Sequence, residues 1–222
     1  MQRFDLINRL IETRSYKSYL EIGLRNPQDC FDHIRCDHKH SVDPGYDYVT
    51  NLATYPYTSD EFFKLLNEGN LDLPADFDWD LIFIDGLHLA EQAYRDFLNS
   101  TTHLSTRGAI VFHDTNPPYL DFAREDPHNF STSAGSDWNG TIWKVIQQIR
   151  TQPRGLDGRD YSVLTVDTDW GVSVCWANPP ESLLSERVNS FFEFNKFSEH
   201  RDLILNLRSV SEFEEWLTIF SQ

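Results

Sequence analysis

The chain has 222 residues, of which 40% are hydrophobic and 24% charged, a composition typical of a globular protein rather than of a disordered or fibrous one. Its 19 basic and 35 acidic residues give a net charge of −16, which argues against nucleic acid and anionic membrane surfaces as partners, because both are negatively charged as well. No stretch approaches the roughly 20 apolar residues that a membrane-spanning helix needs.

Residues 1–150 alternate between helix and strand patterns. Apolar residues at helical spacing predict helices at residues 2–13, 59–69, about 88–102 and 141–150. Short apolar runs that stop at glycine or polar residues predict strands at residues 18–23, 40–45, 80–86 and 108–114. The last two runs are continuous rather than alternating, as expected for strands that are covered on both faces.

A long loop and a strand pair are predicted after the fourth strand. Residues 117–140 are rich in Asp, Ser, Asn and Gly, and a loop of this length is expected to act as a lid or binding segment. Two further strands are predicted at residues 161–166 and 171–176, with Asp169 in a tight turn between them.

The organisation of the whole chain follows from these elements. From Pro179 onward the apolar residues predict helices that can cover the sheet or a second subunit. We therefore expect a domain at residues 1–178 and a helical C-terminal extension at residues 179–222 packed on it, an arrangement compatible with a homodimer. The cysteines fit neither a disulfide framework nor a zinc site, which favours a reducing cytoplasm; they are Cys30, Cys36 and Cys175.

Alternating strands and helices predict an α/β fold, with a mostly parallel sheet and helices on both of its faces. In such folds ligands bind outside the carboxyl ends of the strands. In this chain those ends carry acids, imidazoles and a glycine, namely Glu21, Gly23, Asp43, Asp85, His88, His113 and Asp114. The convergence of these side chains on one edge of the sheet predicts a functional site.

Glu21, Gly23 and Asp43 form the first candidate site. A glycine at the end of the first strand lets a ligand approach the backbone, and an acid 20 residues later can accept the hydroxyls of a ribose. The alternative is that Asp43 only caps the turn beside Pro44. The loop after Gly23 has no glycine before Gly45, which disfavours a dinucleotide and favours a nucleoside without phosphates, such as S-adenosylmethionine.

The second candidate site combines Asp85 and His88 with His113 and Asp114, at the ends of two neighbouring strands. Carboxylates with imidazoles suit a divalent cation, and a nearby neutral histidine can remove a proton from a hydroxyl. Taken alone, each residue is better explained by a structural role, His88 as a helix N-terminal cap and His113 as a strand-end residue bonded to backbone. Because all four residues occur together, we favour a functional interpretation.

At this point the sequence resembles a known family, the class I S-adenosylmethionine-dependent methyltransferases. The resemblance covers roughly residues 15–176 and is closest to a small bacterial group with an Ile-Asp-Gly-x-His motif, related to macrolide sugar O-methyltransferases. The motifs that carry it are Tyr-Leu-Glu-Ile-Gly at 19–23, Val-Asp-Pro-Gly at 42–45, Thr-Ser-Asp-Glu-Phe-Phe at 58–63, Leu-Ile-Phe-Ile-Asp-Gly-Leu-His at 81–88 and Val-Phe-His-Asp at 111–114.

The resemblance implies a Rossmann-like, doubly wound sheet of seven strands with the last strand antiparallel. It also implies a set of residues that bind S-adenosylmethionine. Gly23 would lie under the methionine part and Asp43 would hold the ribose, while Ser59 or Asp60 would lie near the adenine. Glu21 and Asp85 complete the expected cofactor-binding set.

The resemblance further implies a metal site in metal-dependent relatives. Asp85 and the pair His113–Asp114 match the positions that bind magnesium there, and His88 matches the base. His113 departs from the carboxylate or amide that relatives more often carry. Whether this chain binds Mg²⁺, another divalent cation or none is therefore left open.

The function expected from these residues is O-methylation of a hydroxyl on a small molecule or sugar, with S-adenosylmethionine as the methyl donor. A small hydroxylated acceptor, and neither nucleic acid nor membrane, is the expected partner. Two alternatives stay open: a hydrolase that uses a metal at the second site, and a relative that binds the cofactor without catalysis.

Overall fold

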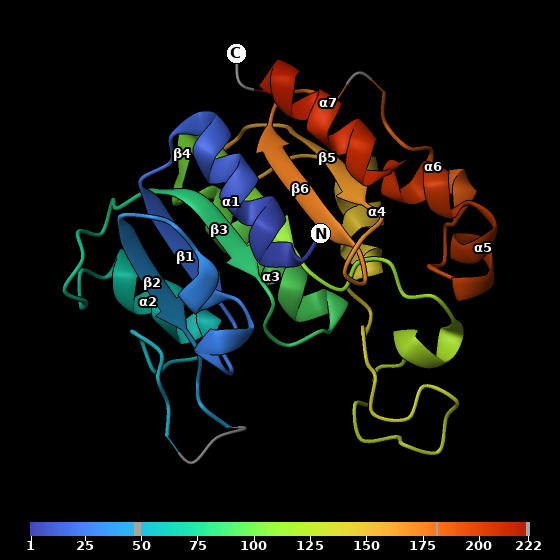
Figure 1. The fold of residues 1–222 in the computed structure, drawn as a ribbon, viewed down its shortest axis with the longest axis horizontal. Coiled ribbons are helices and arrows are strands. Elements are labelled where there is room, and N and C mark those ends of the chain that lie inside the picture. Colours follow the sequence, from blue (N-terminus) through green and yellow to red (C-terminus); the bar gives the residue numbers. More distant parts are fainter. Residues whose placement is uncertain (47–49, 181, 221–222) are drawn as a thin grey trace.

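A seven-stranded sheet runs through the computed structural model, which describes residues 1–46, 50–180 and 182–220 (Figure 1). The strands are β1 Ser18–Ile22, β2 His38–Val42, β3 Trp79–Ile84, β4 Leu104–Phe112, β5 Tyr161–Val166, β6 Val172–Ala177 and β7 Leu207–Arg208. Their order across the sheet is β2-β1-β3-β4-β6-β5-β7.

Strand directions confirm the predicted Rossmann-like class. Strands β2, β1, β3 and β4 pair in parallel, whereas β6 runs antiparallel to both β4 and β5. The antiparallel strand is thus β6, in the predicted final pair, and it is not the last strand of the chain. The seventh strand is β7, a two-residue strand that pairs in parallel with β5 and comes from the segment predicted to be wholly helical.

Helices cover both faces of the sheet (Figure 1). They are α1 Arg3–Arg14, α2 Ser59–Asn67, α3 Ala90–Thr101, α4 Trp143–Thr151, α5 Phe194–Glu199, α6 Arg201–Leu205 and α7 Val210–Phe220. Single turns of 3₁₀ helix are η1 Pro27–Asp29, η2 Phe31–His33, η3 Leu120–Ala123 and η4 Glu186–Val188.

Strand β3 shows how the two layers arise from the sequence. Leu81 and Phe83 point to one face and pack with apolar residues of α1 and α7. Ile82 and Ile84 point to the other face and pack with α2, α3 and α4. All four side chains are buried, which explains why the apolar run is continuous rather than alternating.

Several predicted boundaries shift in the structure. Helix α2 is capped by Thr58, whose Oγ1 accepts from the amide of Glu61 at 3.3 Å, and not by Ser59 or Asp60. Strand β4 begins at Leu104, before the predicted start, because the polar residues 105–107 separate Leu104 from the apolar run that marks the strand.

The C-terminal segment was only partly predicted. Helix α5 begins at Phe194, and among the described residues between β6 and α5 the one helical element is the short η4. Helix α7 packs on α1 through Phe213 and Leu217, which are buried in the same core as Leu6. The boundary at residue 178 stays a prediction. Within the described residues, no helix is both long and apolar enough to span a membrane.

Candidate functional site

The carboxyl ends of β1, β3 and β4 lie next to one another in the sheet. Ile22 pairs with Ile84, and Ile84 pairs with Phe112, so the residues that follow these three strands share one edge. Parallel pairing therefore brings together residues that are far apart in the sequence, as the strand-end argument predicted.

Three side chains with close potential ligand atoms, those of Asp85, His113 and Asp114, form a group that we call the Asp85 cluster. His113 contacts both of the other residues. The His113 Nδ1 atom lies 3.2 Å from Asp85 Oδ1 and 3.3 Å from Asp114 Oδ2. One potential ligand atom from each of these three residues lies within 4.8 Å of the others. The predicted second site is thus assembled, and its spacing would allow one ion to touch all three residues.

His88 lies beside the same two carboxylates. Its Nε2 is 3.3 Å from Asp85 Oδ1 and its Nδ1 is 3.2 Å from Asp114 Oδ2. Its ring stacks on Trp138 with centroids 4.9 Å apart. The side chain of His88 is 15% exposed whereas that of His113 is 2% exposed, so His88 is the imidazole that a ligand can reach.

Residues 138–141 hold His88 in this position. The amide of Thr141 donates to the His88 carbonyl at 2.8 Å, and Asn139 Nδ2 donates to Asp114 Oδ1 at 2.7 Å. Gly140 has a φ of +65°, and a Cβ built there would lie 2.0 Å from the His88 carbonyl oxygen. This segment, which the sequence predicts as the junction of the long loop and the next helix, is therefore part of the site.

Arg3 and Asp169 also join the Asp85 cluster, and the sequence analysis missed both. Arg3 Nη1 lies 3.0 Å from Asp85 Oδ2, and Arg3 Nε lies 3.1 Å from Asp169 Oδ2. Asp169 Oδ1 in turn lies 3.6 Å from His113 Nε2. Asp169 does lie in the predicted turn, but the turn directs its carboxylate into the site. No local pattern pointed to Arg3, since it starts an ordinary amphipathic helix.

Ion pairing outweighs burial in this cluster. Burial opposes ionisation of Asp85, yet His113 and His88 hold the pKa of Asp85 well below its usual range. Burial also opposes charge on His113, yet Asp85 and Asp114 raise the pKa of His113 well above its usual range. The pKa of Asp169 falls to about 2, because its contacts with His113 and Arg3 outweigh the effect of burial.

Glu21 is the buried acid at the end of β1. Its Oε2 accepts a hydrogen bond of 2.5 Å from the hydroxyl of Tyr19. Burial raises the pKa of Glu21 to about 8, with the nearby charge of Asp85 acting in the same direction. Glu21 is therefore mostly neutral at pH 7, and a neutral carboxyl can donate a hydrogen bond as well as accept one.

Gly23 and Asp43 lie side by side at the ends of β1 and β2. The amide of Gly23 donates to the carbonyl of Val42 at 2.8 Å. Gly23 has a φ of +92°, and a Cβ built there would lie 2.3 Å from the Cα of Gly86, so this position requires glycine. Asp43 accepts from the amides of Arg25 at 2.9 Å and Gly45 at 2.6 Å. Asp43 thus caps the turn beside Pro44, as the alternative to ribose binding expected. Its role in binding a ribose stays a prediction.

A family model described as a methyltransferase domain matches residues 30–115. This part of the chain is similar to a methyltransferase domain. The match spans β2 and β3 and ends just after β4, so it includes all four residues of the second candidate site. The resemblance to class I methyltransferases is thereby confirmed, whereas the narrower group with the Ile-Asp-Gly-x-His motif stays a prediction.

Solved structures similar to this chain include three methyltransferases. One is a proposed caffeoyl-CoA O-methyltransferase from Staphylococcus aureus, with 17% identity over 79% of this chain and 82% of that chain and a TM-score of 0.49. Another is the O-methyltransferase TomG from Streptomyces achromogenes in complex with SAM, with 12% identity over 79% of each chain and a TM-score of 0.47. The third is MycE from the mycinamycin biosynthetic pathway with Mg and SAH, with 16% identity over 87% of this chain and 53% of that chain and a TM-score of 0.48. No curated protein matches the chain.

Ser59 and Asp60 lie at the start of α2 and are tied to α3. Gln92 Nε2 donates to Ser59 Oγ at 3.1 Å and to Asp60 Oδ1 at 3.3 Å. The same amide nitrogen donates to the buried Asp96 at 3.0 Å. These contacts place both residues at the junction of α2 and α3, and their expected position near an adenine stays a prediction.

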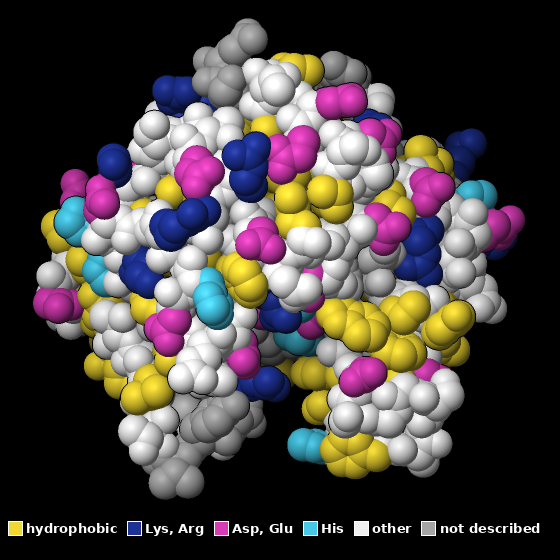
Figure 2. All heavy atoms as spheres, in the orientation of Figure 1, with side chains coloured by type: hydrophobic (Ala, Val, Ile, Leu, Met, Phe, Trp, Pro, Cys, Tyr) yellow, Lys and Arg dark blue, Asp and Glu magenta, His cyan; other side chains and the backbone are white. Residues whose placement is uncertain are grey.

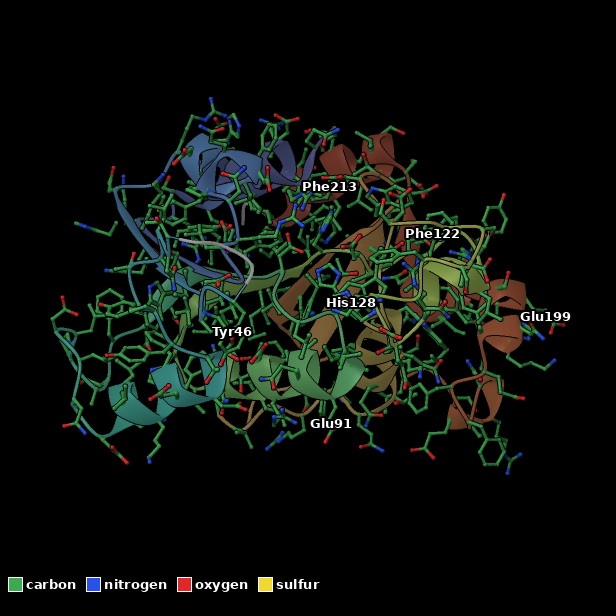
Figure 3. The ribbon with its side chains drawn as sticks, turned by 90° about the horizontal axis from the view of Figure 1, so that it is seen from below. Tyr46, Glu91, Phe122, His128, Glu199 and Phe213 are labelled. Carbon is green, nitrogen blue, oxygen red and sulfur yellow. The ribbon has the colours of Figure 1, made fainter. Side chains whose placement is uncertain are left out.

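A notch opens at the end of the molecule that carries these strand ends (Figure 2). Figure 3 looks onto this end, with Tyr46 on one side and Phe122 and His128 across from it. Phe122 stacks on Trp170 of the β5–β6 turn, with centroids 5.5 Å apart. The loop of residues 117–140 therefore forms one wall of the opening, and its role as a lid or binding segment stays a prediction.

Arg124 orders this loop from within. Its guanidinium donates to the carbonyl oxygens of Asp121 and Asp137, each at 2.7 Å, and to that of Gly135 at 2.9 Å. Its own carbonyl accepts from Trp138 Nε1 at 2.7 Å. Through Trp138, the folded loop is connected directly to the ring of His88.

Proposed function

We propose that this chain transfers a methyl group from S-adenosylmethionine to a hydroxyl oxygen of a small molecule. The observation that carries the proposal is the position of His88. It is a reachable imidazole, held between Asp85 and Asp114 at the strand ends of a methyltransferase domain. The glycine and acid suited to a nucleoside, Gly23 and Asp43, lie on the adjacent strands.

The residues at the ends of β1 and β2 suit this cofactor. The backbone at Gly23 has no side chain to exclude a ligand, and Asp43 lies beside it with a carboxylate able to accept from a ribose hydroxyl. We expect Gly23 to lie against the methionine part, with Ser59 and Asp60 towards the adenine. When bound, the cofactor supplies an electrophilic methyl group on a sulfonium sulfur, which leaves as a neutral thioether.

His88 is the proposed general base, and its contacts assign the nitrogen that accepts the proton. Nδ1 lies 3.3 Å from the carbonyl oxygen of Trp138, which can only accept a hydrogen bond, so we assign the ring hydrogen of neutral His88 to Nδ1. Nε2 then carries the lone pair that takes the hydroxyl proton of the acceptor, and the N–H that forms there lies 3.3 Å from Asp85 Oδ1. The acceptor oxygen forms its bond to carbon as the bond between carbon and sulfur breaks.

Asp85 and Asp114 stabilise the imidazolium that results. Burial opposes the charge on His88, but the two carboxylates outweigh burial and raise the pKa of His88. This effect strengthens His88 as a base. Most of the remaining acceleration would come from holding the two reactants in line, since the reaction needs no covalent intermediate with the protein.

The predicted divalent cation does not fit the cluster while Arg3 is bound there. Asp85 Oδ2 already pairs with Arg3, and Asp114 Oδ1 accepts from Asn139. Arg3 Nη1 also lies 3.2 Å from His113 Nδ1, the nitrogen that would have to bind the ion. No step of the proposed reaction therefore uses a metal, and the rival hydrolase, which requires one, is disfavoured.

The experiment compares wild type with His88→Ala. We expect calorimetry to detect binding of S-adenosylhomocysteine to both, with dissociation constants within about threefold, since His88 is assigned to the acceptor and not to the cofactor. Transfer of labelled methyl from S-adenosylmethionine to a panel of simple glycosides and phenols should fall by about 10²–10⁴-fold in the variant. His38→Ala, which changes an exposed histidine at the first residue of β2, away from the strand ends that form the site, is the matched control and should keep full activity.

Each outcome of this experiment has a definite meaning. Failure of wild type to bind S-adenosylhomocysteine contradicts the proposal and revives the hydrolase. Binding without transfer to any acceptor of the panel favours a non-catalytic relative. Full activity of His88→Ala would leave the methyltransferase intact and show that the base is a different residue.

A further inference from the structure

Arg3 places a positive charge against the group that could otherwise hold a metal. Its guanidinium touches Asp85 Oδ2 at 3.0 Å and His113 Nδ1 at 3.2 Å. Asp85 and His113 are two of the three residues whose spacing suits one ion. A divalent cation bound to these atoms would lie close to the guanidinium and be repelled by it.

Arg3 is held firmly in this position. Its backbone amide donates to Asp169 Oδ2 at 2.8 Å, and its Nε donates to the same oxygen at 3.1 Å. Thr168 Oγ1 also donates to the carbonyl oxygen of Met1 at 2.5 Å. The start of α1 is thereby fastened to the β5–β6 turn, while Leu6 on the same helix is buried in the core. The guanidinium is therefore presented by a packed helix and not by a free terminus.

The guanidinium of Arg3 lies among the carboxylates that a metal would need. Three carboxylates face one another there, from Asp85, Asp114 and Asp169. Arg3 pairs directly with Asp85 and Asp169. A histidine binds a metal only as the neutral imidazole, so an ion at His113 would replace a proton there, whereas Arg3 would keep its charge 3.2 Å from His113 Nδ1. The ion and the guanidinium would then repel each other unless Arg3 moved away.

We propose that Arg3 is the resident cation of the Asp85 cluster, that it positions Asp85 and that it excludes divalent metals. It acts on the proposed reaction only through Asp85, so it is a positioning residue and not a catalytic one. The exclusion of metal is a property of the cluster itself. The expectation that methyl transfer needs no metal rests additionally on the proposed function.

The test measures binding of Mn²⁺ by electron paramagnetic resonance to the full chain, as wild type and as Arg3→Met, Arg3→Gln and Arg3→Lys. Both neutral variants should bind Mn²⁺ at least about tenfold more tightly than wild type, a change of the size expected when groups around a metal ligand are altered. Arg3→Lys keeps the charge and should bind as weakly as wild type. Arg9→Met is the matched control, because Arg9 lies on the same helix but pairs with the exposed Glu214 at 2.6 Å.

Two results would overturn the inference. One is stoichiometric binding of Mn²⁺ by wild type with the affinity of the neutral variants, and the other is no gain in affinity in either neutral variant that folds. Methyl transfer gives a second readout, since wild-type activity should persist in EDTA. Loss of all wild-type activity in EDTA would contradict metal independence. Absence of any activity would count against the proposed function alone, because the Mn²⁺ comparison does not depend on it.

Discussion

At the scale of single residues, the site combines an acid kept neutral with acids kept charged. Glu21 lies near the end of β1 and Asp85 follows the neighbouring β3, yet their surroundings shift their pKa values in opposite directions. The carboxyl of Glu21 is buried and hydrogen-bonded to the neutral hydroxyl of Tyr19, whereas the carboxylate of Asp85 is buried next to two imidazoles and a guanidinium. Burial alone therefore does not determine whether a carboxyl at this edge is charged. The charge of the groups that contact the carboxyl determines it.

The raised pKa of Glu21 makes a prediction about stability and pH. Because folding raises this pKa from about 4.5 to about 8, the folded state holds the proton more tightly than the unfolded state. The stability that this proton supports is complete below about pH 4.5 and is lost as the pH rises through 8. Each pKa unit corresponds to about 1.4 kcal/mol, so Glu21→Gln should gain stability relative to wild type by a few kcal/mol at pH 9.

Urea unfolding of wild type and Glu21→Gln at pH 5, 7 and 9 measures this effect. The difference between the two proteins isolates Glu21, since all other titrating groups are shared. A difference that stays constant across this range would show that the pKa of Glu21 is close to its unfolded value.

At the scale of elements, the segment of residues 138–141 connects the loop to the base. Gly140 allows the chain to pass the His88 carbonyl closely, and Thr141 holds that carbonyl and the first amide of α3 at once. His88 is thus oriented by the end of the loop as well as by the strand that precedes it. Movement of the loop would therefore displace the His88 ring directly.

Gly140→Ala tests this connection. A methyl group there would meet the His88 carbonyl, so we expect methyl transfer to fall at least about tenfold and stability to fall by about 2 kcal/mol or more. Gly135→Ala is a matched control, because Gly135 has a similar φ of +59° in the same loop but nothing within 4 Å of its added Cβ. Both substitutions carry the same backbone strain, so equal losses in the two variants would refute a specific role for Gly140.

The same scale shows what could be predicted from the sequence. Strands β1 to β6 and the four residues of the second candidate site were predictable, because buried strands are apolar runs and the polar ends of parallel strands meet at one edge. The two-residue β7 was not. Arg3 and Asp169 were not, because their role depends on long-range packing. Arg3 reaches Asp85 across 82 positions of sequence, and Asp169 reaches Arg3 across 166. Asp169 and Trp170 both have the left-handed backbone conformation that shapes the turn between β5 and β6, and neither residue type predicts that conformation.

At the scale of the whole molecule, the two layers of helices serve different parts of the site. Helices α2 and α3 lie on one face and carry Ser59, Asp60 and Gln92, which belong to the expected adenine side. Helix α1 lies on the other face, beside α7, and places Arg3 in the Asp85 cluster (Figure 1). The C-terminal segment, which includes Phe213 (Figure 3), therefore supports the site indirectly by packing α1 in place.

The most direct test of the account is a crystal structure of the full chain with S-adenosylhomocysteine. We predict that the nucleoside will lie against Gly23 with its ribose hydroxyls at Asp43, and that the sulfur will face the opening beside His88. The opposite result is a nucleoside bound elsewhere, or one whose sulfur points away from His88, and either would contradict the assignment of this strand edge as the site of methyl transfer.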